Sequence, residues 1–421
     1  MSNSRLDASP PTPDSLTDPV EILDIILDPR RRGPLYPYLK RMRELDPVHS
    51  TEVLHGRPGW VLTSYADARR VLSDHSMISD SRNCNVFDTG PTGQQFFELM
   101  KRTLLYLEPG DHKRNRRFLS KFFTPRAVRN RQQTIQRVVD DLLDRAESAG
   151  KMDLVTDFAF PVPSTVILEI LGIPEEDLPI FHRWLNDFAR RGDISGVTPE
   201  VERLGEEATQ GFTDYFMGLI RDRRKCPGED LVTLLVQPDA QRGELSDEEL
   251  VAACVLLIQG GHETTANMIG NSVNALLRNP DQLQILQREP ERIQMAVDEL
   301  IRYDSSVHVV QRVGPNDIEL RGKTIPAGQV CLLLTGATNR DPERFPDPDR
   351  LDFDRQDVQH LSFGLGTNVC LGVHLARTEL RTALGALIAR FPTLQFVEEG
   401  VEPDYTDSLF LRGLRQLHVT W

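Results

Sequence analysis

The stretch "HLSFGLGTNVCLG", residues 360–372, places a cysteine between glycines and directly before an apolar run. Gly364, Gly366 and Gly372 allow the backbone around Cys370 to bend and to approach a flat ligand closely. A bent backbone directs N–H groups at the sulfur, and a helix that begins after the cysteine adds the positive end of its dipole. A thiolate that ligates iron needs such donors and shielding from water. A lone cysteine beside glycines is more often a buried small hydrophobe, so the spacing around it has to decide.

That spacing is specific. Phe363, Gly366, Cys370 and Gly372 follow the order F-x-x-G-x-x-x-C-x-G, and here the chain resembles the cytochrome P450 family of haem-thiolate monooxygenases. The resemblance implies that Cys370 is the axial iron ligand of a haem b cofactor. It also implies that Phe363 covers the sulfur and that Gly364 and Gly372 shape the cysteine loop.

The residue patterns predict a mainly α-helical fold with a small β component. Helices are expected over about 177–191 and 199–225, and a long apolar helix is expected from the capping box of Ser246 and Glu249 to about Arg278. A further helix should begin near Cys370. These elements match the single large helical domain with small sheets that the resemblance implies.

Two other segments complete the expected organisation. Residues 307–335 alternate with period two, which predicts the small sheet. The polar, proline-rich residues 1–20 are expected to be disordered, and residues 21–421 to form the haem-thiolate monooxygenase domain, because no linker divides them.

Composition narrows the class of protein further. The chain has 421 residues and a net charge of −14, which disfavours nucleic acid as a partner. Its five cysteines are scattered and form no CxxC pair, a pattern typical of a reducing compartment. No signal peptide and no run of about 18 apolar residues occurs, so we expect a cytoplasmic protein without a membrane segment, and a monomer.

The stretch "LLIQGGHETTANMIG", residues 256–270, interrupts the long apolar helix with polar residues. Two glycines inside a helix destabilise it by about 1 kcal/mol each relative to alanine, so they need a reason. A kinked helix with a polar patch is one reason. The family pattern is another, because it implies that Thr264 hydrogen-bonds the dioxygen above the iron and that Glu263 relays protons. His262 has no such role in the pattern, and we expect it to be structural.

In "DELIRYD", Glu299 and Arg302 lie three residues apart on one helix face, with the acid first. An arbitrary pair of this kind is usually a surface ion pair of little energetic value. Here it matches the E-x-x-R motif of the family, and the resemblance implies Arg344 as the third partner. The implied role is support of the fold behind the haem.

The stretch "LEPGDHKRNRRFLSKFF" places His112 and Arg116 four residues apart, on one face of a helix. Buried haem propionates need cationic or hydrogen-bonding partners. The resemblance implies that His112, Arg116, Arg312 and His360 bind them. Where the family usually has a second His or Arg, this chain has Asn368, which donates a hydrogen bond but carries no charge.

Lys113, Arg117 and Lys121 recur at intervals of four and form a separate basic stripe. Such a run is often only a solvated surface. The resemblance places the stripe on the cysteine side of the haem, where ferredoxin, supplied by a ferredoxin reductase, would dock as the electron donor.

The resemblance implies an oxygen-dependent hydroxylase or epoxidase. Because soluble bacterial members of the family often modify secondary metabolites, it also implies a role in bacterial secondary metabolism, such as antibiotic biosynthesis. A peroxide-driven oxidase is an alternative, although it would have little need of Glu263 and Thr264, and a haem-thiolate gas sensor without turnover is a third. The resemblance implies a largely apolar pocket for a free or carrier-protein-bound small molecule. Its expected lining is Phe87, Phe96, Phe97, Ile258, Val309, Val310, Phe410 and Leu411.

Overall fold

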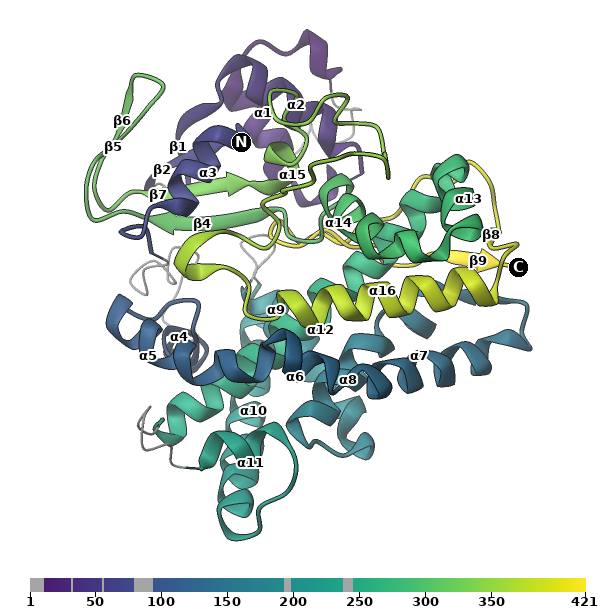
Figure 1. Ribbon diagram of the computed structural model, residues 1–421. Helices are drawn as coiled ribbons and strands as arrows, with labels where there is room; N and C mark the ends of the chain where they lie inside the picture. The colour runs from purple at the N-terminus through teal and green to yellow at the C-terminus, as the bar shows by residue number, and fades with distance from the viewer. Residues whose placement is uncertain (1–10, 32, 55–56, 79–93, 193–197, 238–244) are drawn as a thin grey trace.

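A computed structural model describes residues 11–31, 33–54, 57–78, 94–192, 198–237 and 245–421. Helices make up most of the molecule, and the sheets are small (Figure 1). The helices are α1 (Pro19–Leu27), α2 (Leu35–Leu45), α3 (Tyr65–Ser73), α4 (Gln94–Lys101), α5 (Pro109–Ser120), α6 (Pro125–Arg129), α7 (Gln132–Glu147), α8 (Pro161–Leu171), α9 (Leu178–Gly192), α10 (Pro199–Lys225), α11 (Leu231–Val236), α12 (Asp247–Arg278), α13 (Pro280–Arg288), α14 (Ile293–Tyr303), α15 (Thr335–Thr338) and α16 (Val373–Arg390).

The strands in the described part of the chain form three sheets. The largest has the order β1-β2-β7-β4, in which β2 and β7 are parallel and the other pairs antiparallel. A second sheet has the order β3-β9-β8, and β5 and β6 form a hairpin. The strands are β1 (Val48–Leu54), β2 (Arg57–Leu62), β3 (Lys151–Asp153), β4 (Val309–Val313), β5 (Ile318–Leu320), β6 (Lys323–Ile325), β7 (Val330–Leu334), β8 (Gln395–Phe396) and β9 (His418–Thr420).

Helix α12 is the central element. Ser246 and Glu249 form the expected capping box at its start, and Asn279 caps its end before Pro280. The helix packs against α8, α10 and α16, and α16 lies across the molecule above α7 (Figure 1). Two hydrophobic core clusters meet the helix, one over 250–258 and one over 268–276. The polar segment 259–267 lies between the two clusters, and belongs to neither.

The prediction of a disordered N-terminal segment is wrong for residues 11–20. Pro13–Ser15 form a turn of 3-10 helix, and α1 begins at Pro19. Leu16 is 3% exposed because it packs into the core with α1 and α2, and its carbonyl accepts a hydrogen bond from Arg41. Residues 1–10 lie outside the described residues.

The other expected elements are present with small differences. Helices α9, α10 and α12 agree closely with the expected ranges, and α16 begins three residues after Cys370. Among the described residues, no helix is both long and apolar enough to cross a membrane.

Candidate active site

The loop around Cys370 is built by glycines in left-handed conformations. Gly364 has φ +68° and Gly366 has φ +71°, values that side chains strongly disfavour. A Cβ atom on Gly366 would also lie 2.5 Å from the carbonyl oxygen of Leu72. The loop turns back so that the Cys370 N–H donates to the Phe363 carbonyl at 2.8 Å.

The Cys370 side chain is solvent-accessible, yet protein atoms surround it densely, so it lies in a recess. Burial raises the pKa of the thiol; the Gly372 N–H and the charges of Arg116 and Arg377 lower it but only in part, so the pKa stays above its ordinary value. Donors and positive charges around a recessed sulfur are the environment that a thiolate ligand requires. A Cβ atom on Gly372 would meet no atom within 4 Å, so this backbone borders open space.

Three basic residues gather beside the loop. His112 and Arg116 lie on α5, and Arg312 lies on β4. Arg116 donates to the Val369 carbonyl at 2.6 Å, and a Cβ atom on Gly364 would lie 3.8 Å from Arg312 Nη2, so both guanidinium groups lie close to the cysteine loop.

The cluster of His112, Arg116 and Arg312 is basic and largely buried. Burial, and then the charges of Arg116 and Arg312, lower the pKa of His112 to about 4. Burial also lowers the pKa of Arg116, and it lowers the pKa of Arg312 to about 10. His112 is therefore a neutral hydrogen-bonding group near neutral pH, whereas Arg116 and Arg312 are buried cations that a bound anion would stabilise. The residues therefore fit the two propionates of a haem bound beside the Cys370 loop.

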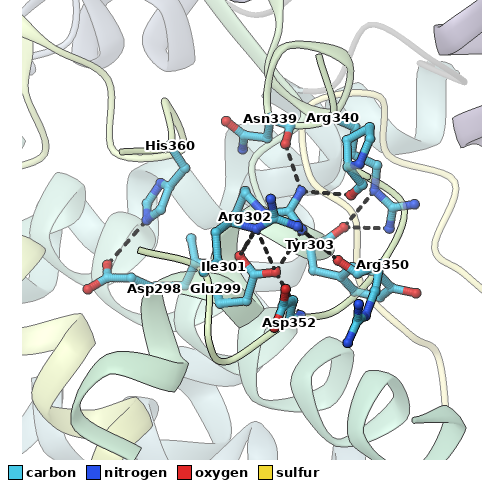
Figure 2. A network of polar contacts seen from close by, with 12 residues as sticks. Asp298, Glu299, Ile301, Arg302, Tyr303, Asn339, Arg340, Arg350, Asp352 and His360 are labelled. Carbon is cyan, nitrogen blue, oxygen red and sulfur yellow. Dashed lines mark hydrogen bonds and ion pairs between the residues drawn. The ribbon is translucent and has the colours of Figure 1, made fainter. Parts of the chain in front are cut away.

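The structure places His360 elsewhere, and the expectation that it binds a propionate is not met. Its Nε2 lies 3.3 Å from Asp298 Oδ1 (Figure 2). Its Nδ1 accepts a hydrogen bond from the Ser362 N–H. Both ring nitrogens are thus engaged, and a propionate beside the Asp298 carboxylate would be repelled. Asn368 is partly buried at the end of the Gly366–Asn368 turn, inside the cysteine loop.

On α12, Gly260 is exposed although most of the helix is buried, and a Cβ atom there would meet nothing within 4 Å. Thr264 lies one turn later, and its hydroxyl donates to the Gly260 carbonyl at 2.8 Å. Glu263 is partly exposed. His262 is buried and its ring packs edge-on against Phe160 at 4.1 Å, as expected of a structural residue.

The E-x-x-R pair is buried, and its third partner differs from the prediction. Arg302 donates to both carboxylate oxygens of Glu299 at 2.7 and 2.8 Å (Figure 2). Arg355 is the third partner, with its Nε 3.3 Å from Glu299. The prediction of Arg344 is wrong, because that side chain pairs with Asp357 at 2.6 Å. Three further acceptors for Arg302 are the carbonyls of Asn339, Pro348 and Arg350.

The expected pocket residues do not form one cluster in the structure. Phe96, Phe97 and Ile258 belong to one core cluster, and Val309 to another, against which Phe410 packs. Val310 packs against a third cluster. Leu411 is partly buried and pairs with Val307. Phe87 lies outside the described residues.

Sequence reasoning missed Arg191, whose guanidinium lies 5.4 Å from the Phe96 ring centroid and 4.8 Å from that of Phe97. Its place in an amphipathic helix gave no sign that it would be buried. The basic stripe is as expected: Lys113 and Arg117 are exposed on α5, and Lys121 follows at its end, over the ring of Phe122.

Comparisons with known proteins identify the family to which such a site belongs. The family model for cytochrome P450 matches residues 15–419. Cytochrome P450 CYP107DY1 of Priestia megaterium is 36% identical over 91% of this chain and 94% of its own length. Mycinamicin IV hydroxylase/epoxidase of Micromonospora griseorubida is 35% identical over 90% of this chain and 94% of its own.

A solved structure shares the fold. P450BioI, in complex with an acyl carrier protein ligated to hexadec-9Z-enoic acid, superposes with a TM-score of 0.86 at 34% identity, covering 92% of this chain and 98% of its own. The chain therefore belongs to the cytochrome P450 family of haem-thiolate monooxygenases.

Proposed function

We propose that this monooxygenase inserts one oxygen atom from O2 into a largely apolar small molecule, by hydroxylation or epoxidation, in bacterial secondary metabolism. The observation that carries the proposal is the basic cluster of His112, Arg116 and Arg312 beside the recessed Cys370 thiol. The named activity of the mycinamicin relative supports the reaction class.

In this proposal Cys370 is the axial ligand, and the three basic residues hold the propionates of haem b. Haem b would supply the redox chemistry that activates dioxygen. The chain's own part is to exclude bulk water and to deliver protons. The Thr264 hydroxyl donates its single proton to the Gly260 carbonyl, so its oxygen would accept a hydrogen bond on the side of the reacting oxygen, and Glu263 would hold a proton and pass it inward.

Electrons are proposed to arrive from ferredoxin, reduced by ferredoxin reductase, at the basic stripe. The stripe lies on α5, the helix from which Arg116 contacts the cysteine loop. An acidic donor would be attracted to this positive surface on a protein of net charge −14.

The substrate is proposed to be either free or carried by a carrier protein. The complex of P450BioI with an acylated carrier protein shows that this fold accommodates such a substrate. Spectral titration with the same acyl group, free and carrier-linked, distinguishes the two forms by their affinity. A cytoplasmic location remains a prediction that cell fractionation tests.

The test of the proposed function is the spectrum of the reduced protein with carbon monoxide. Wild-type protein should give the thiolate-type spectrum and consume O2 with a redox partner and substrate. Cys370→Ser should lose that spectrum, whereas Cys226→Ser, at an exposed free cysteine, should keep it. A thiolate spectrum that survives in Cys370→Ser would contradict the ligand assignment. A thiolate spectrum without turnover on any substrate would favour a sensor.

A further inference from the structure

Arg377 on α16 lies one side chain away from the cysteine loop. Its guanidinium carbon is 5.0 Å from the centroid of the Phe363 ring, a distance typical of a cation–π contact. The Phe363 carbonyl in turn accepts the hydrogen bond from the Cys370 N–H. A charged group therefore covers the residue that holds the Cys370 backbone in place.

Asp298 on α14 fixes the position of Arg377. Its Oδ1 accepts hydrogen bonds from Arg377 Nε at 2.8 Å and lies 2.7 Å from Arg377 Nη2. The same oxygen lies 3.3 Å from His360 Nε2 (Figure 2). The His360 ring centroid is 5.5 Å from that of Phe363. Burial raises the pKa of Asp298, but the hydrogen bond from His360 and the charge of Arg377 outweigh it, and the pKa is lowered. The carboxylate is therefore a stable anchor.

The pair is sheltered enough for its charges to act at a distance. The side chains of Arg377 and Asp298 are 28% and 19% exposed. Charges in such positions are screened less than those on an open surface. Arg377 is also one of the groups whose positive charge lowers the pKa of the Cys370 thiol.

We propose that Arg377 is a positioning residue that raises the reduction potential of the centre at Cys370, and that Asp298 sets the strength of this effect. The inference rests on the proposed role of Cys370 as ligand. When an external donor supplies one electron, the centre becomes more negative, and a fixed positive charge stabilises that state. The negative charge of Asp298 opposes it.

The experiment is spectroelectrochemical titration of the haem-loaded protein. Arg377→Gln should lower the ratio of reduced to oxidised protein at a fixed potential by about threefold, which is about 30 mV for a one-electron couple. Asp298→Asn should raise the ratio by a similar factor, and the double variant should return it close to wild type. Arg377→Lys, which keeps the charge, should retain most of the wild-type potential.

Arg390→Gln is the matched control. Arg390 lies on the same helix, is 30% exposed and pairs with Asp144 at 2.7 Å, but it lies at the far end from Cys370. The Arg390→Gln variant should have the same reduction potential as wild type. A role in packing alone predicts that Arg377→Gln and Asp298→Asn shift the potential in the same direction, and that result would overturn the proposal, as would no shift in either.

Thermal unfolding and the carbon monoxide spectrum distinguish loss of fold, failure of the ligand assignment and failure of this inference. Thermal unfolding of each variant identifies loss of fold; if Arg377→Gln does not fold, the test rests on Asp298→Asn, whose potential should still rise above that of wild type. If wild type gives the thiolate-type carbon monoxide spectrum and the potentials do not move, only this inference fails. If wild type lacks that spectrum, the proposed ligand fails and this inference fails with it.

Discussion

Arg344 and Arg355 belong to the same arginine-rich stretch, but only Arg355 contacts Glu299. The Glu299 side chain is 2% exposed and that of Arg355 is 9% exposed, so this ion pair is buried. A buried carboxylate that loses a partner is strongly destabilising, because its desolvation is no longer offset. Arg344 pairs with Asp357, whose side chain is 56% exposed, and solvent screens that interaction.

At this scale we expect the two arginines to differ in their contribution to stability. Arg355→Ala should lower the free energy of unfolding by about 2 to 3 kcal/mol, because it also removes hydrogen bonds to the Pro346 and Asp347 carbonyls. Arg344→Ala should lower it by less than about 1 kcal/mol. Urea denaturation of both variants measures the difference. Equal losses would show that the Glu299 site does not depend on Arg355.

At the scale of elements, the cysteine loop and helix α16 each contain a glycine, and the two glycines are of different kinds. Gly366 has a positive φ and touches the Leu72 backbone, so it is required by both conformation and space. Gly385 lies inside α16, and a Cβ atom there would meet nothing within 4 Å. The first glycine defines the loop, whereas the second only weakens the helix.

These two positions should respond to alanine with opposite signs. Gly366→Ala should destabilise the protein by about 2 kcal/mol or more, because it strains the backbone and forces the Leu72 carbonyl aside. Gly385→Ala should stabilise it by about 0.5 to 1 kcal/mol, through the unfolded chain and helix propensity. Thermal unfolding compares both with wild type. A destabilised Gly385→Ala would mean that the open space beside the helix is needed.

The distance along the chain between interacting residues explains which features the sequence could predict. The capping box of α12 and the helical face shared by His112 and Arg116 depend on residues within one or two turns of helix. Both could therefore be predicted from the sequence. The partners of His360 and Glu299 come from elements distant along the chain, such as Asp298 on α14, 62 residues before His360. No periodicity fixes which side chain of an irregular loop reaches such a partner, so the expectations for His360 and Arg344 failed.

At the scale of the whole molecule, two buried groups on facing helices give the stability opposite pH dependences. Burial raises the pKa of Glu379 on α16 well above its usual value, so folding favours its protonated form. The contribution of Glu379 to the free energy of unfolding therefore falls as the pH rises above about 4.5, the ordinary pKa of the carboxyl. His262 on α12 acts in the other direction, because folding keeps its ring neutral.

Burial, and then the charge of His182, lower the pKa of His262 to about 3 from an ordinary value of 6.5. Between these values the unfolded chain binds a proton that the folded ring does not, so stability falls as the pH falls from 6.5 toward 3. At about 1.4 kcal/mol per pH unit, the free energy of unfolding falls by about 3 to 5 kcal/mol over this range. His262→Phe, which keeps the aromatic contact with Phe160, should flatten the acid side of a plot of unfolding free energy against pH. His418→Phe, at an exposed residue of β9, should leave that slope as in wild type, and an equally flattened slope in both would contradict the assignment.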